Sequence, residues 1–314
     1  MALDQATTHL LNEMAKMGGK PMSECTPEEA RAMSPGAEMY GEGPKMAEEK
    51  EFKIAVEGGE IELMTLKPSN DPQAIIVYYH GGGWVLSDIY AFKALGQKMA
   101  KQTNSTVVLV NYRKAPEHQF PVPINDSYTA LKWVEEHKAE LASEDAPLIV
   151  AGDSAGGNIS AVMCLKSKRE NGPKIHMQAL IYPVTANDFT RPSYIDPQNQ
   201  LILDKPLMEW FWNHYVPNLS DRLNSEVSPL YATDLEGLPQ AVVLTAGHDV
   251  LRDEGEEYAT KLMKAGVPVT FERFADQTHG FFSFVNILPG SDRGIEFISK
   301  TIVNALPVKE EAVA

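Results

Sequence analysis

Apolar and polar positions along the chain separate short strand-like runs from longer amphipathic stretches. Eight runs are rich in β-branched and aromatic residues, which is typical of β-strands. The fourth to the seventh are apolar almost throughout, as expected for parallel strands covered on both faces. A pair of glycines between the first two favours a hairpin. The runs span residues 51–56, 60–66, 74–79, 106–112, 147–152, 177–183, 241–247 and 269–274.

Amphipathic segments with helical periodicity fill most of the gaps between these runs. Because a hairpin is followed by alternating strands and helices, we predict an α/β fold. Its sheet is mixed, mainly parallel and eight-stranded, with helices on both faces. The predicted helices lie within residues 88–102, 124–141, 154–170, 252–265 and 291–305.

Two regions depart from this alternation. Residues 1–48 are rich in methionine, glycine and proline, and residues 184–238 include a predicted helix that Asp204 could cap. We predict that the two regions fold over the sheet as a cap, and that residues 49–183 and 239–314 form the main domain. The alternative is that they pack as ordinary peripheral helices, with a disordered N-terminus.

Charge and composition narrow the choice of partners. The 314 residues include 43 acidic and 28 basic side chains, for a formal charge of −15. This balance argues against nucleic acid or an anionic membrane as a partner, since both attract basic surfaces.

We find no secretory signal and no apolar run of membrane-spanning length. Cys25 and Cys164 have no metal-ligand spacing, which favours free thiols in a reducing compartment and a cytoplasmic protein.

The sequence "AGDSAGG" (151–157) lies between a predicted buried strand and a predicted helix. It contains the G-x-S-x-G pattern, in which a serine occupies a sharp strand-to-helix turn and glycines keep side chains out of that turn. By average composition the pattern alone arises by chance about once in ten chains of this length. Its position between strand and helix makes Ser154 a candidate nucleophile.

A nucleophilic serine needs a base, and the base needs an acid that orients it. His279 is favoured among the eight histidines because it follows the last predicted strand. Asp249 follows the penultimate strand and is the favoured acid. Asp253, which we expect instead to cap the next helix, and Asp276, three positions before the histidine, are the alternatives. The order Ser154, Asp249, His279 is that of α/β-hydrolases.

Three consecutive glycines in "VYYHGGGWVLSD" (77–88) follow a predicted buried strand. A tetrahedral intermediate of acyl transfer carries an oxyanion that backbone N–H groups stabilise. Ala155 supplies one such donor beside the nucleophile, and Gly82 and Gly83 can supply others without obstructing the substrate. We therefore predict an oxyanion hole made of these three residues, against the alternative of a flexible turn. His80 is expected to fix the loop by hydrogen bonding.

Five sequence blocks resemble those of hormone-sensitive-lipase-like esterases and occur in that family's order. The resemblance implies an α/β-hydrolase fold with a helical cap, hydrolysis of carboxylic esters and no cofactor or metal. It likewise implies Ser154 as nucleophile, His279 as general base and then acid, Asp249 as its partner, and the oxyanion hole named above. The blocks are "HGGGW" (80–84), "NYRKAPEHQFP" (111–121), "GDSAGG" (152–157), "HDVLRDEGEEYATKL" (248–262) and "THGF" (278–281).

The chain departs from this family at Val250, where proline is usual, and at Lys114, where an apolar residue is usual. Neither change removes a catalytic group. Arg113, Glu117 and Asp126 are expected to form an ion-pair network that shapes the loop below the site.

The sequence thus predicts a serine carboxylesterase that hydrolyses short- to medium-chain esters through an acyl-enzyme on Ser154. Two alternatives are an amidase or lactonase of narrow specificity, and a non-catalytic hydrolase-fold receptor. Such receptors lack the catalytic histidine, whereas His279 is present here. Since members of the family often pair through the last edge strand, we also expect a homodimer through residues 268–275.

Overall fold

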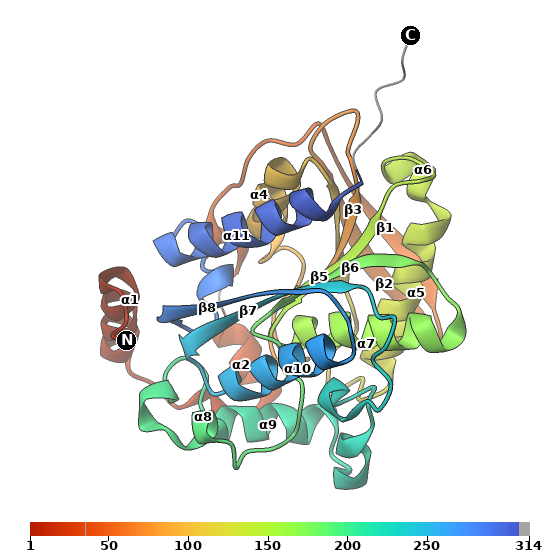
Figure 1. The fold of residues 1–314 in the computed structure, drawn as a ribbon. Helices are drawn as coiled ribbons and strands as arrows, with labels where there is room; N and C mark the ends of the chain where they lie inside the picture. Colours follow the sequence, from red (N-terminus) through yellow and green to blue (C-terminus); the bar gives the residue numbers. More distant parts are fainter. Residues whose placement is uncertain (35, 308–314) are drawn as a thin grey trace.

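An eight-stranded sheet forms the centre of the protein, as expected from the sequence. The structure is a computed structural model that describes residues 1–34 and 36–307. The strand order is β1-β2-β4-β3-β5-β6-β7-β8, antiparallel from β1 to β4 and parallel from there on (Figure 1). The strands are β1 (Glu48–Val56), β2 (Gly59–Lys67), β3 (Ile75–Tyr79), β4 (Thr106–Asn111), β5 (Leu148–Asp153), β6 (Ile175–Ile181), β7 (Gln240–His248) and β8 (Val269–Thr278).

Helices cover both faces of the sheet, as predicted (Figure 1). Helices α4 (Lys93–Thr103) and α11 (Pro289–Ala305) pack on one face, and α5 (Val122–Glu136), α7 (Ala155–Glu170) and α10 (Arg252–Lys264) pack on the other. The predicted helix over 124–141 is divided at His137, where α5 ends and the short helix α6 (Lys138–Leu141) follows.

Strand β3 shows why the central runs are continuously apolar. Ile75, Val77 and Tyr79 belong to the core shared with α5, α7 and α10, whereas Ile76 and Tyr78 belong to the core shared with α4 and α11. All five side chains are fully buried. Successive side chains in a strand point to opposite faces, so a strand covered on both faces needs an apolar residue at every position.

The last strand is longer than the sequence predicts. It continues past Phe274 to Thr278, and its pairing with β7 shifts in register between Ala246 and His248. The last residues of β8 are polar although Gln277 and Thr278 are fully buried, so the apolar pattern stops before the strand does and the sequence placed its end too early. The extension carries the chain to His279.

The inserted region 184–238 contains the predicted helix. Helix α9 (Lys205–Tyr215) begins after Asp204, whose Oδ1 accepts a hydrogen bond from the backbone N–H of Leu207 at 2.8 Å. The predicted N-cap is therefore confirmed. The region also holds α8 (Pro192–Ile195) and the short 3₁₀ turns η2 (Pro197–Asn199), η3 (Leu219–Leu223) and η4 (Pro229–Tyr231).

The N-terminal region is folded and contacts two separate parts of the protein. Its first helix lies beside the end of β8, where the backbone N–H of Asp4 donates to Asp276 O at 3.0 Å (Figure 1). Further along, Trp210 Nε1 in α9 donates to Cys25 O at 3.1 Å. The elements are α1 (Gln5–Met17), η1 (Met22–Glu24), α2 (Pro27–Met33) and α3 (Ala37–Tyr40).

Some positions within the two predicted units lie outside the described residues. These positions are residue 35, in the region predicted as part of the cap, and residues 308–314, at the end of the predicted main domain. Among residues 1–34 and 36–307, no helix combines the length and apolar character needed to cross a membrane.

Candidate active site

Ser154 lies at the turn between strand β5 and helix α7. Its φ is +55°, a left-handed value that is unfavourable for a residue with a side chain. A Cβ atom on Gly152 would overlap the backbone of Gly156, and one on Gly156 would overlap the carbonyl oxygen of Tyr79 in β3. The two glycines are therefore required because helix and sheet approach too closely for a methyl group. This packing fixes the position of Ser154 Oγ.

The structure brings together the three residues that the sequence singled out as nucleophile, base and acid. His279 follows β8, and its Nε2 lies 3.0 Å from Ser154 Oγ while its Nδ1 lies 2.8 Å from Asp249 Oδ2. Asp249 is fully buried, and its Oδ1 accepts a hydrogen bond from the backbone N–H of Leu251 at 2.9 Å. A carboxylate, an imidazole and a hydroxyl thus form one continuous hydrogen-bonded chain.

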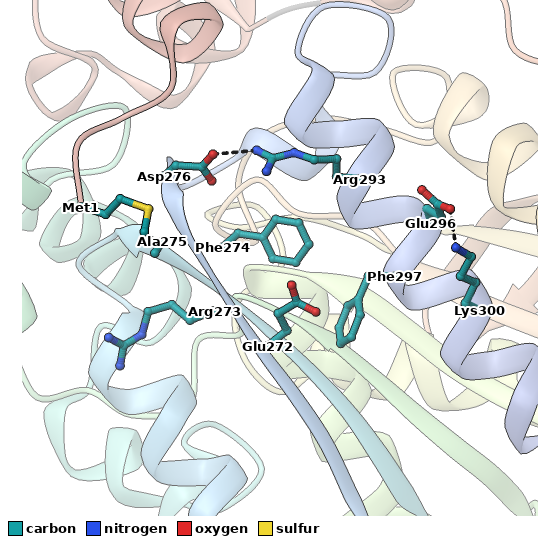
Figure 2. A pocket seen from close by; sticks show the side chains of 10 residues that line it. All are labelled: Met1, Glu272, Arg273, Phe274, Ala275, Asp276, Arg293, Glu296, Phe297 and Lys300. Carbon is teal, nitrogen blue, oxygen red and sulfur yellow. Dashed lines mark hydrogen bonds and ion pairs between the residues drawn. The ribbon is translucent and has the colours of Figure 1, made fainter.

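The two alternative acids bind other groups. Asp253 Oδ2 accepts from the backbone N–H of Ser193 at 2.8 Å, and Asp276 pairs with Arg293 at 2.9 Å (Figure 2). Asp253 lies in the first turn of α10 and is not its N-cap, since the cap position is occupied by Leu251. The expected helix-capping role of Asp253 is therefore wrong.

The glycine loop, residues 80–86, follows β3 and turns sharply next to the nucleophile turn. Gly82 and Gly83 have φ values of +112° and +59°. A Cβ on Gly82 would overlap Leu86 O, and one on Gly83 would overlap the ring of Phe211 in α9. Gly81 differs, because its N–H already donates to Asp153 Oδ1 at 2.9 Å.

The donors available for an oxyanion are consistent with this loop geometry. Within residues 1–34 and 36–307, the structure records no acceptor for the backbone N–H groups of Gly82 and Gly83. Ala155 is the first residue of α7, where a helix leaves its N–H groups without intrahelical partners. These three N–H groups are the ones that the sequence predicted as oxyanion donors, and that role stays a prediction.

Buried His80 holds the start of the loop. Its Nδ1 lies 2.7 Å from Gly81 O, and its ring stacks on Tyr112 at a centroid distance of 4.4 Å. Burial lowers the pKa of His80 to about 3, so the ring is neutral at ordinary pH. A neutral, stacked imidazole suits the expected role of fixing the loop.

Asp153 links the nucleophile turn to the glycine loop, a function that the sequence did not reveal. Its Oδ1 accepts hydrogen bonds from Tyr78 and from the N–H of Gly81, both at 2.9 Å. Burial raises the pKa of Asp153 to about 6, although these hydrogen bonds oppose the shift. An acidic residue at the buried end of an apolar strand was the available signal, since such a residue needs partners.

A residue of the N-terminal region also fixes the glycine loop. Arg31 donates to Val85 O at 2.9 Å and to Ala115 O at 2.7 Å, and forms two hydrogen bonds with Glu117, both at 2.7 Å. These bonds from Arg31 lower the pKa of Glu117 to about 2. Arg113 pairs with Asp126 at 2.7 Å, as expected. The expected network is therefore incorrect for Glu117, whose partner is 86 residues upstream in the sequence.

Helix α9 packs directly on the glycine loop. The ring of Trp84 stacks on that of Tyr215 at a centroid distance of 4.3 Å and packs against that of Trp212 at a centroid distance of 5.2 Å. Phe211 covers Gly83. Ser154 is only 7% exposed. Among the described residues, no cluster of three or more histidine, cysteine, aspartate or glutamate side chains is arranged to hold a metal ion.

Comparison with known proteins gives one consistent result. Residues 76–283 match the sequence profile of a family described as having an alpha/beta hydrolase fold. The chain is 42% identical to carboxylesterase NlhH of Mycobacterium tuberculosis over 225 residues, 70% of each protein. A solved alpha/beta hydrolase from the metagenome of Lake Arreo superposes with a TM-score of 0.90 at 33% identity, covering 96% of this chain and 98% of that one. A thermostable esterase from Pseudomonas putida superposes with a TM-score of 0.89 at 33% identity, covering 98% of this chain and 99% of that one.

The raised pKa of Asp153 predicts a pH-dependent stability. The folded-state pKa lies above that of the unfolded chain, so the stabilising contribution is greatest at low pH and is lost as the pH rises through about 6. Asp153→Asn does not titrate. We therefore expect wild type to lose roughly 1 to 2 kcal/mol of unfolding free energy relative to the variant between about pH 5 and pH 8. Denaturant unfolding at a series of pH values measures this difference.

Asp145→Asn, at an exposed position, is the matched control and should follow wild type across the series. A difference between wild type and Asp153→Asn that stays constant with pH would show that Asp153 does not titrate in this range.

Proposed function

This chain belongs to the hormone-sensitive-lipase-like family of α/β-hydrolases and is a carboxylic ester hydrolase, and we propose that Ser154, His279 and Asp249 carry out its reaction. The expected family, fold and enzyme class are confirmed by the comparisons. The observation that best supports the three roles is the hydrogen-bonded chain from Asp249 through His279 to Ser154.

In the proposed reaction, Ser154 Oγ attacks the ester carbonyl while His279 Nε2 accepts its proton. The tetrahedral intermediate then collapses, and His279 returns the proton to the departing alcohol oxygen. Water, deprotonated by His279, then attacks the acyl-enzyme, and His279 returns that proton to Ser154 Oγ as the bond to the acyl group breaks and the carboxylic acid leaves. Asp249 keeps the Nδ1–H of the imidazole directed away from the serine and stabilises the imidazolium that forms in each step.

The proposed oxyanion hole consists of the N–H groups of Gly82, Gly83 and Ala155. Its support is the positive φ of both glycines and the position of Ala155 at the helix start beside the nucleophile. Donors held by the fold need no reorganisation when the negative charge develops, and the loss of one typically costs about 3 kcal/mol of transition-state stabilisation.

We propose that residues 1–48 and 184–238 form the cap over a catalytic domain made of 49–183 and 239–314. The packing of α9 on the glycine loop and the hydrogen bond between Trp210 and Cys25 support this division. A cap that brings Phe211 against Gly83 leaves limited space near the oxyanion. We therefore propose short- and medium-chain esters as substrates.

Two proposals concern the protein as a whole. Strand β8 forms one edge of the sheet, and its residues 270–273 are exposed. We propose that this edge pairs with that of a second copy, because an edge strand presents unpaired backbone groups.

We also propose a cytoplasmic location, which suits the two free cysteines Cys25 and Cys164.

Ser154→Ala tests the proposed reaction on a series of p-nitrophenyl esters from acetate to palmitate. Wild type should be most active on short to medium acyl chains. The variant should lose about 10⁵-fold in kcat, because no nucleophile remains. Ser167→Ala, at a buried serine near the far end of helix α7, should keep wild-type activity. Retained hydrolysis by folded Ser154→Ala would exclude the proposed nucleophile.

Phe211→Ala tests the cap. Removing the ring above Gly83 opens space for a longer acyl chain, and each buried methylene contributes about 0.8 kcal/mol. The ratio of kcat/KM for hexanoate to that for acetate should rise about tenfold. Phe189→Ala, whose ring packs on Tyr194 in the same region, is the control and should leave the ratio unchanged. An unchanged ratio in Phe211→Ala would contradict a pocket limited by this ring.

Phe271→Glu tests the proposed dimer by light scattering. Phe271 is 40% exposed on β8, and two like charges brought together across paired edges would repel each other. We expect wild type at twice the monomer mass and the variant at the monomer mass. Leu219→Glu, at an exposed position in η3, should remain dimeric. A monomeric wild type would rule out the dimer.

A further inference from the structure

The first seven residues lie across the ends of the two strands that lead to Asp249 and His279. Met1 O accepts a hydrogen bond from His248 Nε2 at 2.8 Å, directly before Asp249. The backbone N–H of Asp4 donates to Asp276 O at 3.0 Å, three residues before His279. Figure 2 shows Met1 beside the end of β8, close to Asp276. The segment thus contacts the ends of both strands that lead to the proposed acid and base.

Gln277 is the centre of this contact. Its side-chain amide is fully buried, as is Thr7. Thr7 Oγ1 donates to Gln277 Oε1 at 3.2 Å, and Gln277 Nε2 donates to Asp4 Oδ2 at 2.7 Å. Both ends of one buried amide are therefore satisfied by residues about 270 positions away in the sequence. Leaving such an amide without partners would be costly.

Asp4 joins this contact to helix α11. Its Oδ1 accepts from the backbone N–H of Thr7 at 2.7 Å, and its Oδ2 also lies 3.5 Å from Arg293, which pairs with Asp276 (Figure 2). Burial alone would raise the pKa of Asp4, but hydrogen bonds from Thr7 and Gln277 hold it below its ordinary value. The carboxylate is thus charged at neutral pH and binds three elements at once.

The sheet itself holds this part of β8 less regularly than the rest. The register with β7 shifts between Ala246 and His248, and Thr278 is the last paired residue before His279. An irregular ladder leaves fewer regular backbone bonds to fix the direction of the chain. The contact with Gln277 lies within this interval.

We propose that Met1–Thr7 is a positioning segment of the active site, in which Asp4 and Thr7 act through Gln277 to keep His279 Nε2 within hydrogen-bonding distance of Ser154 Oγ. This inference rests on the proposed catalytic roles of Ser154 and His279. Displacement of a catalytic group by about 1 Å can cost up to about 100-fold in rate. The segment therefore affects turnover without touching the substrate.

Thr7→Val tests the proposal, because it keeps the shape of the side chain and removes the hydroxyl that holds Gln277. We expect kcat to fall about five- to tenfold with KM within about twofold of wild type, as the base is misplaced while the substrate pocket is intact. Thr7→Ser restores the hydroxyl and should recover most of kcat. Thr260→Val makes the same change at an exposed threonine of α10, whose hydroxyl donates to Glu256 O and not to the N-terminal segment, and should match wild type.

A double variant tests whether Thr7 acts on His279 through Gln277. In a Gln277→Leu background, Thr7→Val should lower kcat no further, since the amide on which it acts is absent. If the valine variant does not fold, Thr7→Ala removes the hydroxyl together with the γ-methyl group, and Thr7→Ser, which lacks only that methyl group, is then its reference.

The outcomes separate this proposal from the proposed function. Wild-type kcat in folded Thr7→Val, with Ser154→Ala inactive in the same assay, would overturn the positioning role alone. A lower melting temperature with unchanged kcat would likewise show that the segment only stabilises the fold. Full activity of Ser154→Ala would overturn both proposals. A selective loss of kcat that Thr7→Ser reverses would establish the positioning role.

Discussion

The close approach of helix α7 to strand β3 is the constraint on which the rest of the site depends. Because no Cβ fits at Gly156 beside the carbonyl oxygen of Tyr79, the helix begins directly against the sheet, and Ser154 is held with a positive φ at its start. The glycine loop leaves the sheet immediately after Tyr79. One steric contact thus sets the distance between the nucleophile turn and the proposed oxyanion donors, and Asp153 joins the two by hydrogen bonds.

The sequence predicts those parts of the fold that are local in the chain. Strand runs, the hairpin and the N-cap at Asp204 each follow from neighbouring residues. Ser154, Asp249 and His279 can be singled out because each follows a strand, and parallel strands bring such positions to one edge of the sheet. The end of β8 was misplaced because its last residues are fixed by irregular pairing with β7 and not by an apolar pattern.

Contacts between distant segments could not be predicted in this way. Glu117 was expected to belong to a network with Arg113 and Asp126, but its partner is Arg31, because an ion pair depends on which charges the fold brings together. Asp4 and Thr7 likewise meet Gln277 only in the folded protein. The residues that shape the site from the N-terminal region therefore leave no local signal in the sequence.

The aromatic packing between α9 and the glycine loop has a consequence for how this enzyme can change. Trp84 is both part of the loop and the stacking partner of Tyr215, so the proposed cap is continuous with the loop that carries the proposed oxyanion donors. Selection for a broader substrate range through substitutions in α9 would then disturb turnover at the same time. Compensating substitutions elsewhere in the loop would be needed before promiscuity and speed could improve together.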